Sequence, residues 1–201
     1  ILFENNIFYN QQGEDSHIDI NSALNITLRH NIFFNDFAGN GRSDTNTGSF
    51  IVIKDSNGAE DNILGSQHIT LDGNIFANWE GAIGNSFIAI GDDSNVSYYL
   101  ARDVLIQNNL FIGNAPDLIH TTLKVVGAED VTFRNNTITG DLPGKSFAFR
   151  LTGQTAIPNR NIAFYNNIWT DPTGTMGAEN TQDSNNFADS EATTTYVINN
   201  N

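Results

Sequence analysis

Residues 104–111 read Val-Leu-Ile-Gln-Asn-Asn-Leu-Phe, and this pattern recurs along the whole chain. Each copy has apolar residues at its first and third positions, an Asn at its sixth, and mostly apolar residues after that Asn. The copies place the Asn at positions 6, 31, 74, 109, 136 and 167. A pattern that returns at such intervals is typical of a solenoid, in which every repeat packs against its neighbours. Because the intervals are irregular, we expect one coil per repeat with loops of variable length.

The residues around each Asn predict three strands in every coil. Apolar residues alternate with variable ones before the Asn, which predicts a strand with one buried face, and a second strand follows the Asn. A third strand recurs at 49–53, 86–90, 123–126 and 146–151. In register, these strands would form three parallel sheets with like side chains about 4.8 Å apart. We therefore expect an all-β, single-stranded parallel β-helix with internal Phe and Ile stacks.

The Asn turn gives this fold a second expected feature. Asn tolerates a left-handed backbone, and its amide can bond the equivalent amide one coil away. The sequence therefore predicts an Asn ladder that runs along the solenoid.

Composition limits the partners of the chain. It has 23 acidic and 9 basic residues, for a net charge of −14, which argues against nucleic acid because phosphate binding needs clustered positive charge. There is no cysteine, so disulfide scaffolds and thiolate metal sites are excluded. No apolar run approaches the roughly 20 residues of a membrane span. An acidic, charged surface favours an extracellular or cell-surface location.

Both ends of the chain lie inside the repeat. Ile1 occupies the first position of the pattern, and residues 196–201 spell the opening of another copy. We therefore expect residues 1–201 to be a single β-helix segment of a longer chain. Open strand edges at the two ends would be covered by further coils or by end-to-end self-association.

An Asn-Asn-x-Ile/Phe sequence after a Val-x-Phe strand resembles the repeat of pectate-lyase-like proteins. The resemblance covers essentially the whole chain and implies a right-handed parallel β-helix. That family includes polysaccharide lyases, glycoside hydrolases, epimerases, phage tailspikes and surface proteins. The fold by itself therefore does not choose a function.

The longest insertions mark the places where this scaffold is elaborated, at 35–48, 55–67, 78–85 and 92–101. Loops of this kind carry function more often than the repeat does. Trp79, Tyr98 and Tyr99 lie in these insertions. Exposed aromatic rings can stack on a sugar, so we predict a substrate-binding role for these residues. The alternative is that they cover the core beneath the loops.

Acidic residues follow two of the predicted strands at equivalent positions. Lys54 and Asp55 align with Gly91 and Asp92, and Asp93 comes next. Asp55, Asp92 and Asp93 would bind Ca²⁺ through carboxylate oxygens, with Lys54 contacting substrate. Two carboxylates this close could also act as general acid and base in glycoside hydrolysis, or adjust the charge of Lys54. A plainer alternative is that Asp is an ordinary turn residue at the end of a strand.

Lys124 and Arg150 lie in matching third strands of consecutive coils, where both should point outward. A polysaccharide lyase needs a cation to neutralise a uronate carboxylate and a base to take the C5 proton. Arg150 suits the first role and Lys124 the second, with His120 as a further acid or base. Lyases similar to chondroitinase B use Lys, Arg and Ca²⁺ on a β-helix. The alternative is a solvated face on which Lys and Arg cover apolar surface.

These features support three hypotheses of function. The first is an extracellular, polysaccharide lyase-like protein that binds or cleaves an acidic glycan. The second is a non-catalytic structural or adhesive segment of a surface protein or filament, favoured by the open ends and the incomplete catalytic sets. The third is a glycan-binding module without catalysis.

Overall fold

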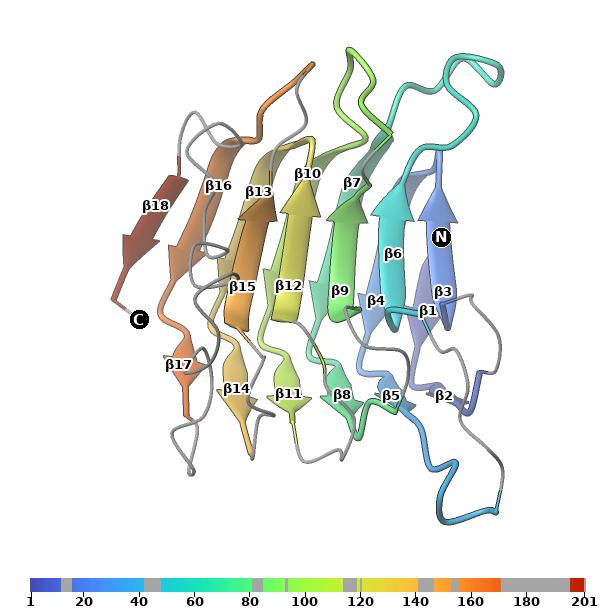
Figure 1. Cartoon of the computed structure of the whole chain (residues 1–201), viewed down its shortest axis with the longest axis vertical. Helices are drawn as coiled ribbons and strands as arrows, with labels where there is room; N and C mark the ends of the chain where they lie inside the picture. Colours follow the sequence, from blue (N-terminus) through green and yellow to red (C-terminus); the bar gives the residue numbers. More distant parts are fainter. Residues whose placement is uncertain are drawn as a thin grey trace.

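The structure, a computed structural model, describes residues 1–11, 16–41, 48–80, 85–92, 94–113, 119, 121–140, 147–152, 156–170 and 196–200. These residues form three parallel sheets and contain no helix (Figure 1). We name the sheets A, B and C in the order in which each coil visits them. The predicted parallel β-helix is confirmed, with three strands in every fully described coil.

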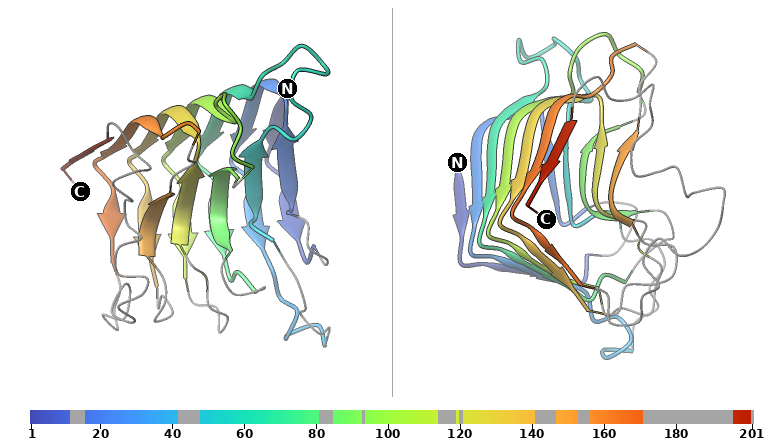
Figure 2. Two further views of the ribbon diagram at one scale, coloured as in Figure 1. Left: turned by 45° about the horizontal axis from the view of Figure 1, so that its top comes forward. Right: turned by 90° about the vertical axis from the view of Figure 1, so that its left-hand side faces the viewer.

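Sheet A consists of β1 (Leu2–Glu4), β4 (Leu24–Arg29), β7 (Ser66–Asp72), β10 (Ala101–Gln107), β13 (Ala128–Arg134), β16 (Arg160–Tyr165) and β18 (Tyr196–Asn199). Sheet B consists of β2 (Ile7–Tyr9), β5 (Ile32–Phe34), β8 (Ile75–Ala77), β11 (Leu110–Ile112), β14 (Thr137–Thr139) and β17 (Ile168–Trp169). Sheet C consists of β3 (Ile18–Asn21), β6 (Ile51–Lys54), β9 (Ser86–Gly91), β12 (Thr121–Val126) and β15 (Phe147–Thr152). Seen along the stack, successive coils superpose sheet upon sheet (Figure 2).

The turn from sheet A to sheet B carries the predicted Asn ladder. Asn109 shows its geometry: Oδ1 accepts from Asn74 N at 2.8 Å, while Nδ2 donates to Asn136 Oδ1 and to Leu71 O, both at 3.0 Å. The ladder residues at 31, 74, 109 and 136 are all buried. The residue before each of them has a positive φ, as at Asn108 with 58°. Every coil therefore repeats the same turn, because each amide satisfies backbone and side-chain groups of its neighbours.

The interior contains a column of aromatic rings in register. Phe8, Phe33, Phe76 and Phe111 stack face to face, with neighbouring centroids 4.8 to 4.9 Å apart. Coil spacing sets this separation, since parallel strands lie about 4.8 Å apart. The inner faces of all three sheets contribute to one continuous core. None of the described segments is a helix long and apolar enough to cross a membrane.

Candidate functional site

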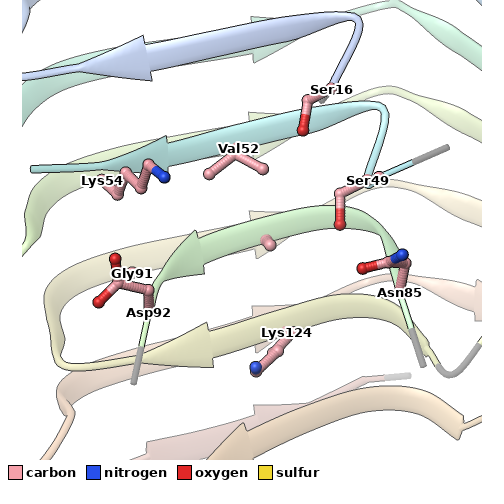
Figure 3. A pocket seen from close by; sticks show the side chains of 10 residues that line it. Ser16, Ser49, Val52, Lys54, Asn85, Gly91, Asp92 and Lys124 are labelled. Carbon is pink, nitrogen blue, oxygen red and sulfur yellow. The ribbon is translucent and has the colours of Figure 1, made fainter. Parts of the chain in front are cut away.

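The outer face of sheet C holds an open pocket of about 190 Å³ (Figure 3). Its walls come from β6, β9 and β12, three adjacent strands of the sheet. The residues that line it are Ser16, Gly48, Ser49, Val52, Lys54, Asn85, Ala89, Gly91, Asp92 and Lys124. Ligand pockets for drug-sized molecules usually measure roughly 300–1,000 Å³. A pocket of this size suits one unit of a longer ligand that continues along the sheet.

Small residues on β9 create the hollow. Ala89 pairs in register with Val52 on β6 and with Lys124 on β12. Gly91 ends β9 with a φ of 76°, and a Cβ there would lie 1.7 Å from Val126 O. No side chain fits at that position, so the floor between the longer side chains of β6 and β12 stays low.

Positive charge lies on both sides of this hollow. Lys54 ends β6 and Lys124 lies in the middle of β12, and both line the pocket with Asp92 between them (Figure 3). Lys54 Nζ is 3.7 Å from Asp19 Oδ2 on the preceding coil. Lys124 pairs in register with Arg150 on β15, so the predicted neighbours do lie side by side. Their catalytic role stays a prediction.

The pocket has two chemically different ends. Lys54 and Asp92 lie at the carboxyl ends of β6 and β9. Ser49 and Asn85 lie just before the same two strands, at their amino ends. One end therefore offers charges, and the other offers hydroxyl and amide groups that can donate or accept hydrogen bonds.

Asp55 has the structural role expected from the plainer alternative, that of a turn residue at the end of a strand. It is buried, with 2% of its surface exposed, and its carboxylate lies within the loop that connects β6 to β7. Oδ1 accepts from the backbone N–H of Asn57 at 3.0 Å and of Gly58 at 2.8 Å, and Oδ2 accepts from Gly65 N at 2.7 Å. Ser22 Oγ adds a fourth hydrogen bond at 3.1 Å. The carboxylate therefore anchors its own loop.

The predicted calcium ligands do not assemble in the part of the chain that the structure describes. The oxygens of Asp55 are occupied by the loop, and Asp92 Oδ1 accepts from Ser94 N at 2.8 Å. No group of three or more His, Asp or Glu side chains suited to a metal occurs among the described residues. Asp93 lies outside them. Ca²⁺ takes six to eight oxygen ligands, which the two described carboxylates do not supply by themselves, so the calcium site stays a prediction.

The three predicted aromatic residues do not form one exposed platform. Trp79 is fully buried and donates from Nε1 to Gly48 O at 3.0 Å, so its predicted role in stacking on a sugar is wrong. Trp79 is buried because its large apolar side chain closes the core beneath this loop. The alternative reading, a cap on the core, describes Trp79.

Tyr98 and Tyr99 have different surroundings. Burial raises the pKa of the Tyr98 hydroxyl, and the negative charges of Asp55 and Asp92 raise it further. Tyr99 contacts two guanidinium groups of sheet A, those of Arg102 and Arg160. Neither tyrosine is among the residues that line the pocket, and their role in substrate binding stays a prediction.

His120 also lies outside the described residues. The sequence prediction included Lys54, Asp92 and Lys124 but missed Ala89 and Gly91, whose small size forms the hollow. Their signal is present in the sequence, because Ala89 lies in register between the longer Val52 and Lys124, and Gly91 pairs with the longer Val126. Comparison with protein-family models, with curated proteins and with solved structures finds no match to this chain.

Proposed function

We propose that the protein is an extracellular carbohydrate-active β-helix protein that binds an acidic glycan along the outer face of sheet C. The single observation that carries this proposal is the hollow over Ala89 and Gly91, flanked by Lys54 and Lys124. The pectate-lyase-like repeat adds to it, since that family includes enzymes that act on polysaccharides. The chain has only 9 basic residues against 23 acidic ones, so cations on two sides of one pocket are a distinctive feature.

The two ends of the pocket match the two ends of a uronate residue. A sugar carboxylate would lie between the ammonium groups of Lys54 and Lys124, where charge-assisted hydrogen bonds are strongest. The ring hydroxyls would then face Ser49 and Asn85, and Asp92 would accept a hydrogen bond from a further hydroxyl. Arg150, beside Lys124 on the next coil, would contact the carboxylate of the following residue.

The lyase hypothesis assigns chemistry to the same residues. In this arrangement Arg150, rather than Lys124, would neutralise the carboxylate of the reacting uronate, and Lys124 in its neutral amine form would take the proton from C5. The electrons of that C–H bond would form a C4–C5 double bond as the C4–O4 bond breaks, and the departing oxygen would take a proton from solvent. The product is unsaturated and absorbs in the ultraviolet.

Binding is tested by calorimetric titration with uronate oligosaccharides. We expect Lys54→Met and Lys124→Met each to weaken binding by about tenfold or more, because each removes a charged partner of the carboxylate. Ala89→Leu should block the pocket without removing any charge. Ala163→Leu is its control, since Ala163 also points outward, on β16 of sheet A. Equal affinity in wild type and Ala89→Leu would refute the site.

Catalysis is tested separately from binding. Lys124→Arg keeps the positive charge but cannot act as a base, because Arg is not deprotonated in proteins. We expect this variant to bind the glycan and form no ultraviolet-absorbing product. Wild-type binding without turnover, with and without Ca²⁺, would instead identify a glycan-binding module.

A second candidate, a structural or adhesive segment, is favoured by the apolar edge of the first coil. Ile1, Leu2 and Ile7 are 76%, 54% and 62% exposed, on strands that have a neighbour on one side only. Another coil placed there would bury these side chains and pair the open edge of β1. Sedimentation at rising concentration tests this, and association that Leu2→Lys abolishes would support it.

A further inference from the structure

We propose that Tyr99, Arg102 and Arg160 form a second binding site, for an anionic group such as a carboxylate or a sulfate, on sheet A. Arg102 Cζ lies 5.9 Å and Arg160 Cζ 5.5 Å from the centre of the Tyr99 ring. Arg102 lies near the start of β10, and Arg160 occupies the equivalent register position on β16. This site is distinct from the sheet C pocket, whose lining includes none of these three residues.

The charges in this cluster do not cancel. Arg102, Glu129 and Arg160 form one row across β10, β13 and β16. Glu129 is buried and makes an ion pair with Arg160. Among the described residues, no carboxylate lies within ion-pair distance of Arg102. The cluster therefore holds two guanidinium groups and one carboxylate, which leaves a net positive charge in a chain whose total is −14.

The hydrogen bonding of Arg102 also leaves room for an anionic ligand. Arg102 Nε is buried and has no hydrogen-bond partner within the described part of the molecule. A buried donor without an acceptor is destabilising, so an acceptor that reaches this side chain would gain a hydrogen bond that the protein alone does not make. The contact with Tyr99 places the guanidinium plane but provides no in-plane acceptor for its N–H groups.

Other arginines on sheet A show the usual arrangement. Arg29 donates from Nε to Glu4 Oε1 at 2.7 Å, across from β4 to β1. Arg134 donates from Nε and Nη2 to Gln107 Oε1 at 3.0 and 2.7 Å. Each of these has an acceptor on the preceding coil, so Arg102 differs from these two arginines, which lie at the other end of the strands of the same sheet.

The aromatic member of the site is held in place before any ligand arrives. Leu100, next to Tyr99, is buried and donates to Gly127 O at 2.9 Å. The carbonyl oxygen of Tyr99 packs so closely on Gly65 that a Cβ there would lie 2.3 Å from it. Binding would therefore require little ordering of this segment, which favours affinity. A planar carboxylate or a sulfate could accept two parallel hydrogen bonds from such a fixed guanidinium.

The test follows the side-chain Nε–H signals of arginine by ¹H–¹⁵N NMR in the full chain. Sodium acetate and sodium sulfate are titrated separately, with sodium chloride at equal ionic strength as the blank. We expect a saturable shift of the Arg102 signal with at least one of the two anions and none at Arg134. A response to acetate identifies carboxylate as the ligand group, and a response to sulfate identifies a sulfated group.

Variants separate binding from general screening. Arg102→Gln should abolish the saturable response at the remaining cluster signals, and Tyr99→Leu should weaken binding by about tenfold, while Tyr99→Phe retains it. Arg134→Gln and Lys124→Ala should leave it unchanged, so the outcome is independent of the sheet C proposal. Shifts no larger than those with chloride, or equal shifts at Arg134, would overturn the inference.

Discussion

The two corners that flank sheet A are built in opposite ways. The corner that leads to sheet B has the same buried Asn in coil after coil, bonded to the Asn above and below. The corner that leads from sheet C to sheet A varies from a tight turn at Gly127 to the loop between Lys54 and Ser66 (Figure 1). Both candidate sites lie beside the variable corner. We therefore expect the repeated Asn corner to contribute mainly to stability and the variable corner to contribute to the candidate sites.

The largest effect is expected where the uniform corner is interrupted. Asn109→Ala removes the acceptor of Asn74 N and the donor to Leu71 O, both in the buried ladder. Because unsatisfied buried groups cost about 1–3 kcal/mol each, the free energy of unfolding should fall by about 3–5 kcal/mol. Urea denaturation measures this loss.

Asn108→Gly is the matched control for the ladder. Asn108 has a φ of 58° and an exposed side-chain hydrogen bond to Asp72, and Gly73 already occupies the equivalent place one coil earlier. We expect a change below about 1 kcal/mol. Similar losses for both variants would show that the ladder is not what stabilises this corner.

A smaller and pH-dependent effect is expected at His17, beside β3 in the first coil. Burial lowers the pKa of His17 from 6.5 to about 4, although its ring nitrogen Nε2 donates a hydrogen bond to Asn35 Oδ1. Folding thus favours the neutral ring. The contribution of the neutral ring to the free energy of unfolding is therefore fully present above pH 6.5. About 3 kcal/mol of it is lost as the pH falls from 6.5 toward 4.

His17→Phe isolates this contribution, because a phenyl ring cannot be protonated and can keep the tilted ring contact that His17 makes with Phe50 at a centroid distance of 4.8 Å. The variant should lose less stability than wild type between pH 6.5 and pH 4 in parallel denaturant titrations. Identical slopes in the two proteins would exclude His17 as the titrating group.

The smallest of the three effects concerns the variable corner. Asp55→Asn should cost about 2 kcal/mol, since the amide cannot accept all the hydrogen bonds that Asp55 receives from Gly58 and Gly65. Amide exchange at these two glycines should accelerate. Asp61→Asn, an exposed change on the same loop, should leave both rates unaltered. Protection retained in Asp55→Asn would contradict the anchoring role.

Repetition explains how much of the molecule could be predicted from the sequence. The Asn ladder, the Phe33–Phe76–Phe111 stack and the pairing of Lys124 with Arg150 follow from equivalent positions in successive coils. The burial of Trp79 and the divergence of Tyr98 from Tyr99 do not, because these residues belong to insertions without a counterpart in the next coil. Ala89 and Gly91 of the pocket were missed for another reason. They form the pocket by being small, whereas prediction of a site from sequence starts from charged, polar and aromatic side chains.

The central claim is tested most directly by a crystal structure of the protein with a bound uronate oligosaccharide. The account predicts a sugar over Ala89, with its carboxylate between Lys54 and Lys124 and the chain continuing toward Arg150. Sugar bound on another face, or lysines that point away from a shared hollow, would contradict it.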